Sequence, residues 1–312
     1  MLNRLLPAAL AIALAAAPAA AADKLTVLLD WFVNPDHAPL VIAKEGGHFE
    51  RHDLDVELVA PADPSAPPRL VAAGQGDIAL TYQPDLMLQL KEGLPLVRFG
   101  TLIETPLNAL IVLKDGPVKS LADLKGKRIG YSVASIQSAY LSGMLETVGL
   151  TMDDVTMVNV NFNLVTALLA GQVDAAIDGY RNFELTQLGI EGKPGLAWFP
   201  EEHGVPVYDE LIYVTRPELK DDRRLGRFLA AVEEATIYLT NHPDEAKAMF
   251  LASHVDLDDE LNRTAFDLTL PRFAKRPAAF DPGRYDRFAA FLKDKGLLDT
   301  VPPAESYTIT VR

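Results

Sequence analysis

Ala73-Gly74-Gln75-Gly76-Asp77-Ile78-Ala79-Leu80 recurs later in the chain as Ala170-Gly171-Gln172-Val173-Asp174-Ala175-Ala176-Ile177. In each copy the pattern predicts the end of a helix, a glycine that stops it, and a short buried strand. The order of the flanking segments, which is strand, helix, strand, helix and strand, also repeats. This repetition predicts two similar α/β lobes, and two lobes form a cleft in which a small molecule can be enclosed.

The segments around each copy alternate between strand and helix patterns. In lobe one the predicted strands are 24–30, 55–59 and 77–80, and the predicted helices are 37–44 and one that ends at Gly74. In lobe two the predicted strands are 128–131, 155–158 and 174–177, and the helices are 137–148 and 163–170. Such alternation predicts an α/β fold with two mostly parallel sheets. Ligands of these sheets lie beyond the carboxyl ends of the strands, which selects four loops, 30–37, 82–85, 132–137 and 178–184.

Two further apolar segments are interpreted as the crossings between the lobes. Asn108–Leu113 is expected to leave lobe one, and Leu211–Thr215 to lead back, with crossings near Lys114 and Tyr213. We therefore expect lobe one to comprise residues 23–113 and 214–312, and lobe two residues 114–213. Apolar residues at helical spacing after residue 225 predict that the last hundred residues rejoin lobe one.

The first 22 residues have the pattern of a cleaved signal peptide. Arg4 gives the positive start, Leu5–Ala17 the apolar stretch, and Ala20–Ala22 the small-residue cleavage site. We expect cleavage after Ala22 and export to the periplasm. Because no later run of eighteen apolar residues occurs, we expect no membrane span in the mature chain.

Composition excludes several classes of function. Loss of the predicted signal peptide removes one basic residue and changes the net charge from −14 to −15, which repels nucleic acid. The chain has no cysteine, so disulfides, thiolate nucleophiles and cysteine-ligated metals are excluded. Its six histidines have no ligand spacing, and His48 and His52 lack an obvious third partner in sequence. This spacing predicts no metal site, and nucleophile elbow, Walker and Rossmann motifs are also absent.

The first selected loop is rich in aromatic and polar side chains. Trp31 and Asn34 are candidate ligand contacts, because flat aromatic faces stack on heterocycles and amides bind ring edges. The alternative is structural: Trp31 or Phe32 closes the core and Asp36 caps the next helix.

The second and third loops add three candidates. Tyr82 can stack on a ring, and the Gln83 amide can donate or accept, whereas Asp85 stands where it would cap a helix. Ser132 begins a strand-to-helix connection whose free backbone N–H groups suit an anionic or carbonyl group.

The fourth loop contains Tyr180, Asn182 and Glu184, all candidate ligand contacts. A carboxylate can accept two parallel hydrogen bonds from the edge of an aminopyrimidine, and such charge-assisted pairs are strong. The alternative for Glu184 is a first-turn residue favoured by the helix dipole. Arg181 is interpreted as a salt-bridge residue and not as a ligand contact.

Several stretches together resemble the thiamine-pyrimidine precursor-binding family, over about residues 24–251. They are Asp30-Trp31, His37-Ala38-Pro39-Leu40, Asp63-Pro64-Ser65, Leu70-Val71-Ala72-Ala73-Gly74, Asp123-Leu124-Lys125-Gly126-Lys127-Arg128-Ile129-Gly130-Tyr131 and Asn182-Phe183-Glu184. This family includes periplasmic receptors for formylaminopyrimidine-type precursors and the fungal enzyme that makes the thiamine pyrimidine. The resemblance implies a two-lobed type II periplasmic-binding-protein fold whose cleft is lined by Trp31, Tyr82, Asn182 and Glu184. It also implies a small heterocyclic ligand and an ABC permease as partners.

Departures from the enzyme favour the receptor. The enzyme's cysteine-rich, iron-associated segment is missing, its cofactor lysine aligns near Thr81, and its reacting histidine aligns near Asp85. An enzyme of pyrimidine synthesis therefore remains the weaker alternative to a receptor without a cofactor.

Related receptors for other ligands share much of this framework. A taurine, sulfonate or nitrate receptor needs cations or N–H groups, and only Arg128 and Arg181 are near the selected loops. Acidic residues in the cleft would repel those anions. A riboflavin-like ring would suit the aromatic residues equally well and stays an open alternative. We expect a monomer whose two lobes close on the ligand by a hinge motion.

Overall fold

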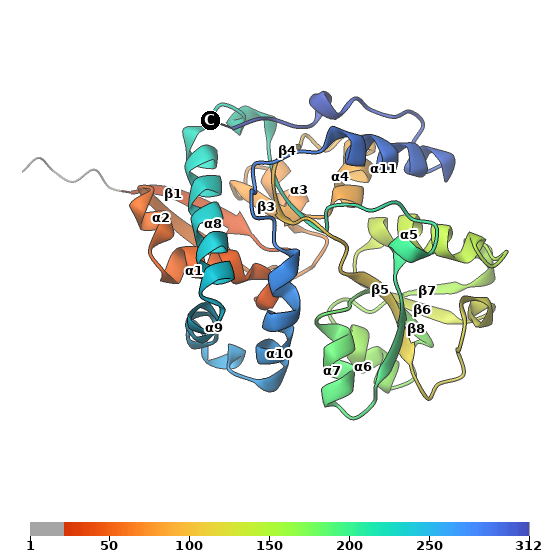
Figure 1. Ribbon diagram of the computed structural model, residues 1–312. Coiled ribbons are helices and arrows are strands. Elements are labelled where there is room, and N and C mark those ends of the chain that lie inside the picture. Colours follow the sequence, from red (N-terminus) through yellow and green to blue (C-terminus); the bar gives the residue numbers. More distant parts are fainter. Residues whose placement is uncertain (1–21, 312) are drawn as a thin grey trace, which may run out of the picture.

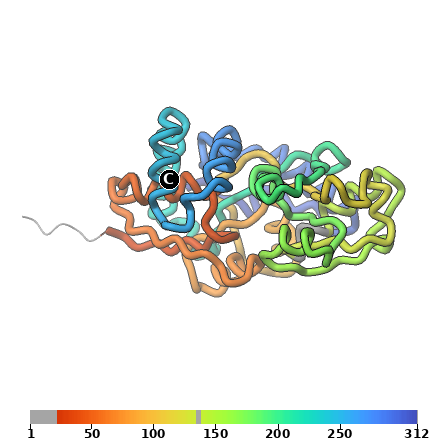
Figure 2. The backbone as a smooth tube through the Cα atoms, turned by 90° about the horizontal axis from the view of Figure 1, so that it is seen from below, coloured from red at the N-terminus to blue at the C-terminus, as the bar shows by residue number. Residues whose placement is uncertain are grey.

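The computed structural model describes residues 22–311, except for the side chains of residues 134–137. All but the last residue of the predicted signal peptide therefore lie outside the described part. Two five-stranded sheets, each covered by helices, form two lobes that lie next to each other (Figures 1 and 2). Within residues 22–311, none of the helices combines the length and the apolar character that crossing a bilayer requires.

Lobe one is built on a sheet with the strand order β2-β1-β3-β10-β4. Its strands are β1 (Asp23–Leu28), β2 (Leu54–Val59), β3 (Ile78–Thr81), β4 (Val97–Ile103) and β10 (Leu211–Thr215). Strand β1 pairs in parallel with β2 and β3, whereas β10 is antiparallel to both β3 and β4. Four strands thus share one direction and only β10 is reversed.

Lobe two repeats this plan with the order β7-β6-β8-β5-β9. Its strands are β5 (Asn108–Leu113), β6 (Arg128–Tyr131), β7 (Thr156–Asn159), β8 (Ala175–Tyr180) and β9 (Gly195–Trp198). Strand β6 is parallel to β7 and β8, and β5 is antiparallel to β8 and β9. The predicted two-lobed α/β fold with mostly parallel sheets is confirmed.

The predicted positions of the two crossings are wrong. Strand β5 pairs with β8 and β9, so it belongs to lobe two, and the first crossing lies at residues 104–107 and not near Lys114. The second crossing lies at residues 199–210, because Tyr213 is already paired with Leu80 and Gly100 in lobe one. An apolar run predicts a buried strand but carries no information on which sheet receives it.

The helices lie on the faces of the two sheets (Figure 1). The α-helices are α1 (Ala38–Glu45), α2 (His48–Arg51), α3 (Pro67–Ala72), α4 (Gln83–Lys91), α5 (Ala134–Glu146), α6 (Leu164–Leu169), α7 (Glu184–Ile190), α8 (Arg223–Asn241), α9 (Pro243–Ala252), α10 (Glu260–Thr269) and α11 (Pro282–Asp294). Short 3₁₀ turns are η1 (Pro35–His37), η2 (Leu121–Leu124), η3 (Met152–Asp154), η4 (Pro200–Glu202), η5 (Pro217–Leu219), η6 (Val255–Leu257), η7 (Leu270–Arg272) and η8 (Ala304–Ser306).

The C-terminal helices return to lobe one and one of them also reaches lobe two. Helix α8 starts at Asp222, whose carboxylate accepts the Arg224 N–H at 2.8 Å, and its buried apolar face packs on α1 and α2. Its Glu234 bonds both His48 and His52, a partner that sequence spacing did not reveal. Helix α10 contacts η1 of lobe one and α7 of lobe two, so it bridges the two lobes.

The sequence repeat has the same structural role in both lobes. Gly74 and Gly171 end their helices with φ values of +77° and +65°, a conformation that glycine adopts without strain. Asp77 then accepts the backbone N–H of Thr26 at 3.0 Å, and Asp174 accepts that of Arg128 at 2.9 Å. Each aspartate thus holds the repeat strand against its parallel neighbour, β1 in lobe one and β6 in lobe two.

Candidate functional site

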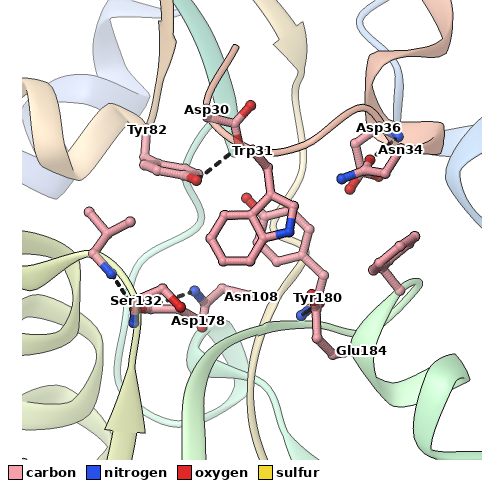
Figure 3. Close-up of a pocket in the computed structure, with 12 residues that line it drawn as sticks. Asp30, Trp31, Asn34, Asp36, Tyr82, Asn108, Ser132, Asp178, Tyr180 and Glu184 are labelled. Carbon is pink, nitrogen blue, oxygen red and sulfur yellow. Dashed lines mark hydrogen bonds between the residues drawn. The ribbon is translucent and has the colours of Figure 1, made fainter. Parts of the chain in front are cut away.

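A pocket lies between the lobes, where loops after β1, β3, β6 and β8 meet the start of β5 (Figure 3). Lobe one contributes Asp30, Trp31, Asn34, Asp36 and Tyr82, and lobe two contributes Asn108, Ser132, Val133, Asp178, Tyr180, Phe183 and Glu184. The cavity volume is about 30 Å³, which holds about two water molecules but no aromatic ring. A ring can therefore enter only after the lobes separate or the aromatic side chains move.

Six of the eight predicted ligand contacts line this pocket together. They are Trp31, Asn34, Tyr82, Ser132, Tyr180 and Glu184. The rule that ligands bind beyond the carboxyl ends of parallel strands therefore selected loops that meet at one pocket, and ligand contact by these residues stays a prediction.

The other two predicted contacts, Gln83 and Asn182, do not line the pocket. Gln83 is fully buried, and its Oε1 accepts the N–H of Asp209 on the second crossing at 2.8 Å. The Nδ2 of Asn182 donates to Asp36 Oδ1 at 2.6 Å and to Thr269 Oγ1 at 2.7 Å. Asn182 thus links lobe two to two elements of lobe one. A position after a strand predicts the loop, but not the direction of each side chain within it.

Trp31 crosses from lobe one into the apolar core of lobe two. Its indole is 8% exposed and packs edge-on against Phe162, with ring centroids 4.5 Å apart. It belongs to a core cluster that otherwise contains residues of lobe two, including Ile111 and Leu164. Its Nε1 is buried without a partner among the described atoms. Phe32, for which a core position was the alternative, is 42% exposed.

The Tyr82 side chain is fixed at the wall of the pocket by Asp30, a residue that the sequence did not select. The Tyr82 hydroxyl donates to Asp30 Oδ2 at 2.9 Å, and His37 Nε2 contacts Asp30 Oδ1 at 3.0 Å. Burial, followed by the charge of Asp30, raises the pKa of the Tyr82 phenol well above its usual range. Tyr82 therefore stays neutral and presents its ring to the pocket (Figure 3).

Asp178 occupies the backbone amides that the sequence predicted to be free. Its Oδ2 accepts the N–H groups of Ser132 at 3.0 Å and of Val133 at 3.1 Å. The Asn108 Nδ2 approaches the other oxygen at 3.5 Å. Burial raises the pKa of Asp178 to about 6, although the two N–H groups oppose this shift. The sequence placed Asp178 at the start of the fourth loop but did not select it, because no local pattern shows that its side chain turns toward these amides.

Glu184 begins α7 and faces the pocket from lobe two (Figure 3). Its Oε2 accepts the Tyr180 N–H at 2.7 Å, and the side chain is buried. Burial raises the pKa of Glu184 to about 7, and the nearby charges of Asp36 and Asp178 act in the same direction. Near neutral pH the group can therefore either donate or accept, which matches the mixed edge of an aminopyrimidine. Glu184 is therefore both a first-turn residue of α7 and a lining residue of the pocket.

Asp36 and Asp85 were expected to cap the helices that follow them, but the N-cap residues of α1 and α4 are His37 and Tyr82. Asn34 caps η1 by accepting the Asp36 N–H at 2.8 Å. Asp36 instead accepts from Asn182 and Thr269, and burial raises its pKa to about 6. Asp85 accepts from its neighbours Thr81 and Gln89.

The charge of the pocket is one-sided. Among the lining residues that the structure describes, four carry carboxyl groups and none carries a basic side chain. Arg181 pairs with Glu201 at 2.8 Å, as its interpretation as a salt-bridge residue predicted, and Arg128 pairs with Asp174 at 3.2 Å. The site therefore favours a neutral or cationic ligand with N–H donors over an anion.

This two-lobed architecture is the fold of periplasmic binding proteins. The alkanesulfonate-binding protein SsuA of Xanthomonas axonopodis pv. citri superposes with a TM-score of 0.73 at 17% identity, covering 93% of this chain and 99% of that one. A model described as NMT1/THI5 like matches residues 34–246, and the chain belongs to that family, as the resemblance in the sequence predicted.

Relatives in sequence are named for thiamine biosynthesis or for aminopyrimidines. A Haemophilus influenzae protein named "Putative thiamine biosynthesis protein" is 47% identical over 295 residues, 94% of each chain. The formylaminopyrimidine-binding protein of Halalkalibacterium halodurans is 33% identical over 246 residues, 78% of this chain and 73% of that one. The 4-amino-5-hydroxymethyl-2-methylpyrimidine phosphate synthase of Schizosaccharomyces pombe is 26% identical, covering 81% of this chain and 76% of the enzyme.

Proposed function

We propose that this protein is the exported substrate-binding component of an ABC importer and that it binds a thiamine-related aminopyrimidine between its lobes. Glu184 would bind the amino group and the adjacent ring nitrogen, while Trp31, Tyr82 and Tyr180 would contact the ring faces. The formylaminopyrimidine-binding relative supports this ligand class. Contacts to both lobes would favour the closed form, because only that form makes all of them.

The observation that carries the proposal is the chemistry of the pocket wall. An acidic side chain with a pKa raised to about 7, Glu184, lies among aromatic rings and beside no basic side chain of the described lining. Trp31 Nε1, Asp36 Oδ2 and Asn108 Oδ1 are buried without partners in the described protein. Since buried polar atoms are normally hydrogen-bonded, these three atoms are consistent with a polar, planar ligand.

Catalysis is the second candidate, because synthases belong to the same set of relatives. The positions that align near the enzyme's lysine and histidine are Thr81 and Asp85, which bond to each other at 3.1 Å inside lobe one and do not line the pocket. Binding without catalysis is therefore the better-supported proposal. Incubation with pyridoxal phosphate and iron is expected to give no pyrimidine product.

Export and docking complete the proposal. Cleavage after Ala22 would release the chain into the periplasm, where the closed form would dock on a permease. Mass spectrometry of the protein from its own host is expected to show a chain that starts at Asp23, the first residue of β1. An intact N-terminus in the mature protein would contradict export by this route.

Isothermal calorimetry tests the ligand. We expect 4-amino-5-hydroxymethyl-2-methylpyrimidine to bind more tightly than its phosphate, because the acidic pocket disfavours a dianion. The Glu184→Gln variant should weaken binding by about 2 kcal/mol when a buried charge-assisted pair is lost. Glu191→Gln, at the exposed far end of the same helix, is the matched control and should bind normally. Unchanged affinity in Glu184→Gln would remove Glu184 from the site.

A further inference from the structure

The connection between β6 and α5 places two adjacent backbone amides at the lobe-two side of the pocket. Both donate to one oxygen of Asp178, Ser132 N–H at 3.0 Å and Val133 N–H at 3.1 Å. Adjacent N–H groups at a strand-to-helix connection are a common seat for an oxyanion of a ligand. In this protein the Asp178 carboxylate occupies that oxyanion-binding site.

The backbone of Asp178 is strained in order to reach this position. Its φ of +72° lies in the left-handed region, which residues other than glycine seldom adopt. Such conformations persist only where the surrounding structure over-determines them, and they concentrate at functional sites. Asp178 lines the pocket, and its contacts with Ser132, Val133 and Asn108 supply that constraint. This backbone conformation and these contacts together fix the Asp178 carboxylate over the two amides.

We propose that Asp178 is a specificity-determining residue. Its carboxylate occupies the N–H groups of Ser132 and Val133, which could otherwise bind an oxyanion, and thereby excludes anionic ligands. Asp30, Asp36 and Glu184 also repel anions by charge, but none of them is bonded to these two amides. The inference rests on the proposed function only for the class of ligand that is admitted, a neutral or cationic ring. The exclusion of oxyanions can be measured separately.

The test is calorimetry of sodium ethanesulfonate with the mature chain and with Asp178→Gly. Glycine adopts the positive φ without strain, frees both amides and removes one negative charge. We expect the variant to bind ethanesulfonate at least about tenfold more tightly than the wild type, since two N–H bonds to a charged group become available. Equal affinities of the two folded proteins would overturn the proposal. Should Asp178→Gly fail to fold, Asp178→Asn, which tolerates the positive φ, still tests the proposal, because a tenfold gain in its affinity for ethanesulfonate would overturn it.

Asp178→Asn separates occupation of the amides from simple charge. Asparagine tolerates positive φ and keeps an oxygen over the two N–H groups, but it carries no charge. We expect its affinity for ethanesulfonate to stay close to that of the wild type and below that of Asp178→Gly. If Asp178→Asn gained as much affinity for ethanesulfonate as Asp178→Gly, charge alone would exclude the anion. That result would overturn the proposed role of the occupied amides. Failure of the wild type to bind the aminopyrimidine would refute the proposed function and leave this comparison intact.

Discussion

Asp77 in lobe one and Asp174 in lobe two hold equivalent places, each accepting a backbone N–H of the strand that lies parallel to the repeat strand, β1 or β6. The next steps along the two strands diverge. Thr81, four residues after Asp77, donates to Asp85 inside its own lobe, whereas Asp178, four residues after Asp174, lines the pocket. The residues that build the sheet are thus repeated, and the residues that face the pocket are not.

Both lobes contribute aromatic and acidic side chains to the pocket, but from positions that the repeat does not match. Lobe one contributes the indole of Trp31 and the ring of Tyr82, both positioned by the first and second loops. Lobe two contributes Asp178 and Glu184, whose pKa values are raised to about 6 and about 7 by burial. A ligand held between the lobes would contact aromatic rings and acidic groups of both, because Tyr180 of lobe two and Asp30 and Asp36 of lobe one also line the pocket. The repeat thus accounts for the two similar sheets, whereas the side chains that line the pocket come from segments in which the two lobes differ.

The largest expected effect tests whether lobe one depends on lobe two through Trp31. Because the indole is buried in the core cluster of lobe two, Trp31→Ala should lower the free energy of unfolding by about 3 kcal/mol. Thermal and urea denaturation measure this loss. Trp198→Ala, on a half-buried residue of β9, is the control and should cost less. A Trp31→Ala protein as stable as the wild type would show that this contact between the lobes is not maintained in solution.

A pH titration of protein stability tests the buried acidic groups. Burial raises the pKa of Glu184 and Glu210 to about 7 and that of Asp36 to about 6. The folded protein therefore binds more protons than the unfolded chain between the ordinary carboxyl pKa, near 4, and about 7. Stability is fully present below the ordinary pKa and should fall by about 2 kcal/mol as the pH rises through 7.

Melting temperatures between pH 5 and pH 8 measure this slope. Glu184→Gln should flatten it, because the amide does not titrate, whereas Glu191→Gln should leave it unchanged. A melting temperature that rises steadily over this range would contradict the raised pKa values.

Single substitutions in each lobe test whether the two copies of the repeat are structurally equivalent. Asp77→Ala and Asp174→Ala should each lower the free energy of unfolding by about 1–2 kcal/mol, since each leaves a backbone N–H without its partner. The effects should add in the double variant, because the sites lie in different sheets and share no partner. Denaturant titration checks this, and a loss confined to one variant would mean that the two copies are not equivalent.

The smallest expected effect concerns the link from Asn182 to Asp36 and Thr269. Asn182→Ala should favour separation of the lobes and weaken ligand binding by about tenfold, or about 1.4 kcal/mol, with little loss of stability. Calorimetry and small-angle scattering of the free protein measure the two changes. Thr186→Val removes a bond made within lobe two, from Thr186 Oγ1 to the Asn182 carbonyl, and should alter neither. Equal affinities in the two variants would remove Asn182 from the closure of the cleft.

Sequence alone determined the features that depend on short stretches of chain. Glycine stops, alternating strand and helix patterns and the repeat predicted two α/β lobes and the four loops at their strand ends. These patterns are local, since the conformation of a few neighbouring residues decides them. Six of the eight selected side chains indeed line one pocket.

Only the tertiary structure decided the rest. The tertiary structure placed β5 in lobe two and turned Gln83 and Asn182 away from the pocket. It also brought the Asp178 carboxylate within hydrogen-bond distance of the amides of Ser132 and Val133. Each of these outcomes depends on hydrogen-bond partners that lie far away in the sequence. Which sheet accepts a strand, and which way a loop side chain points, follow from satisfying all buried polar groups at once.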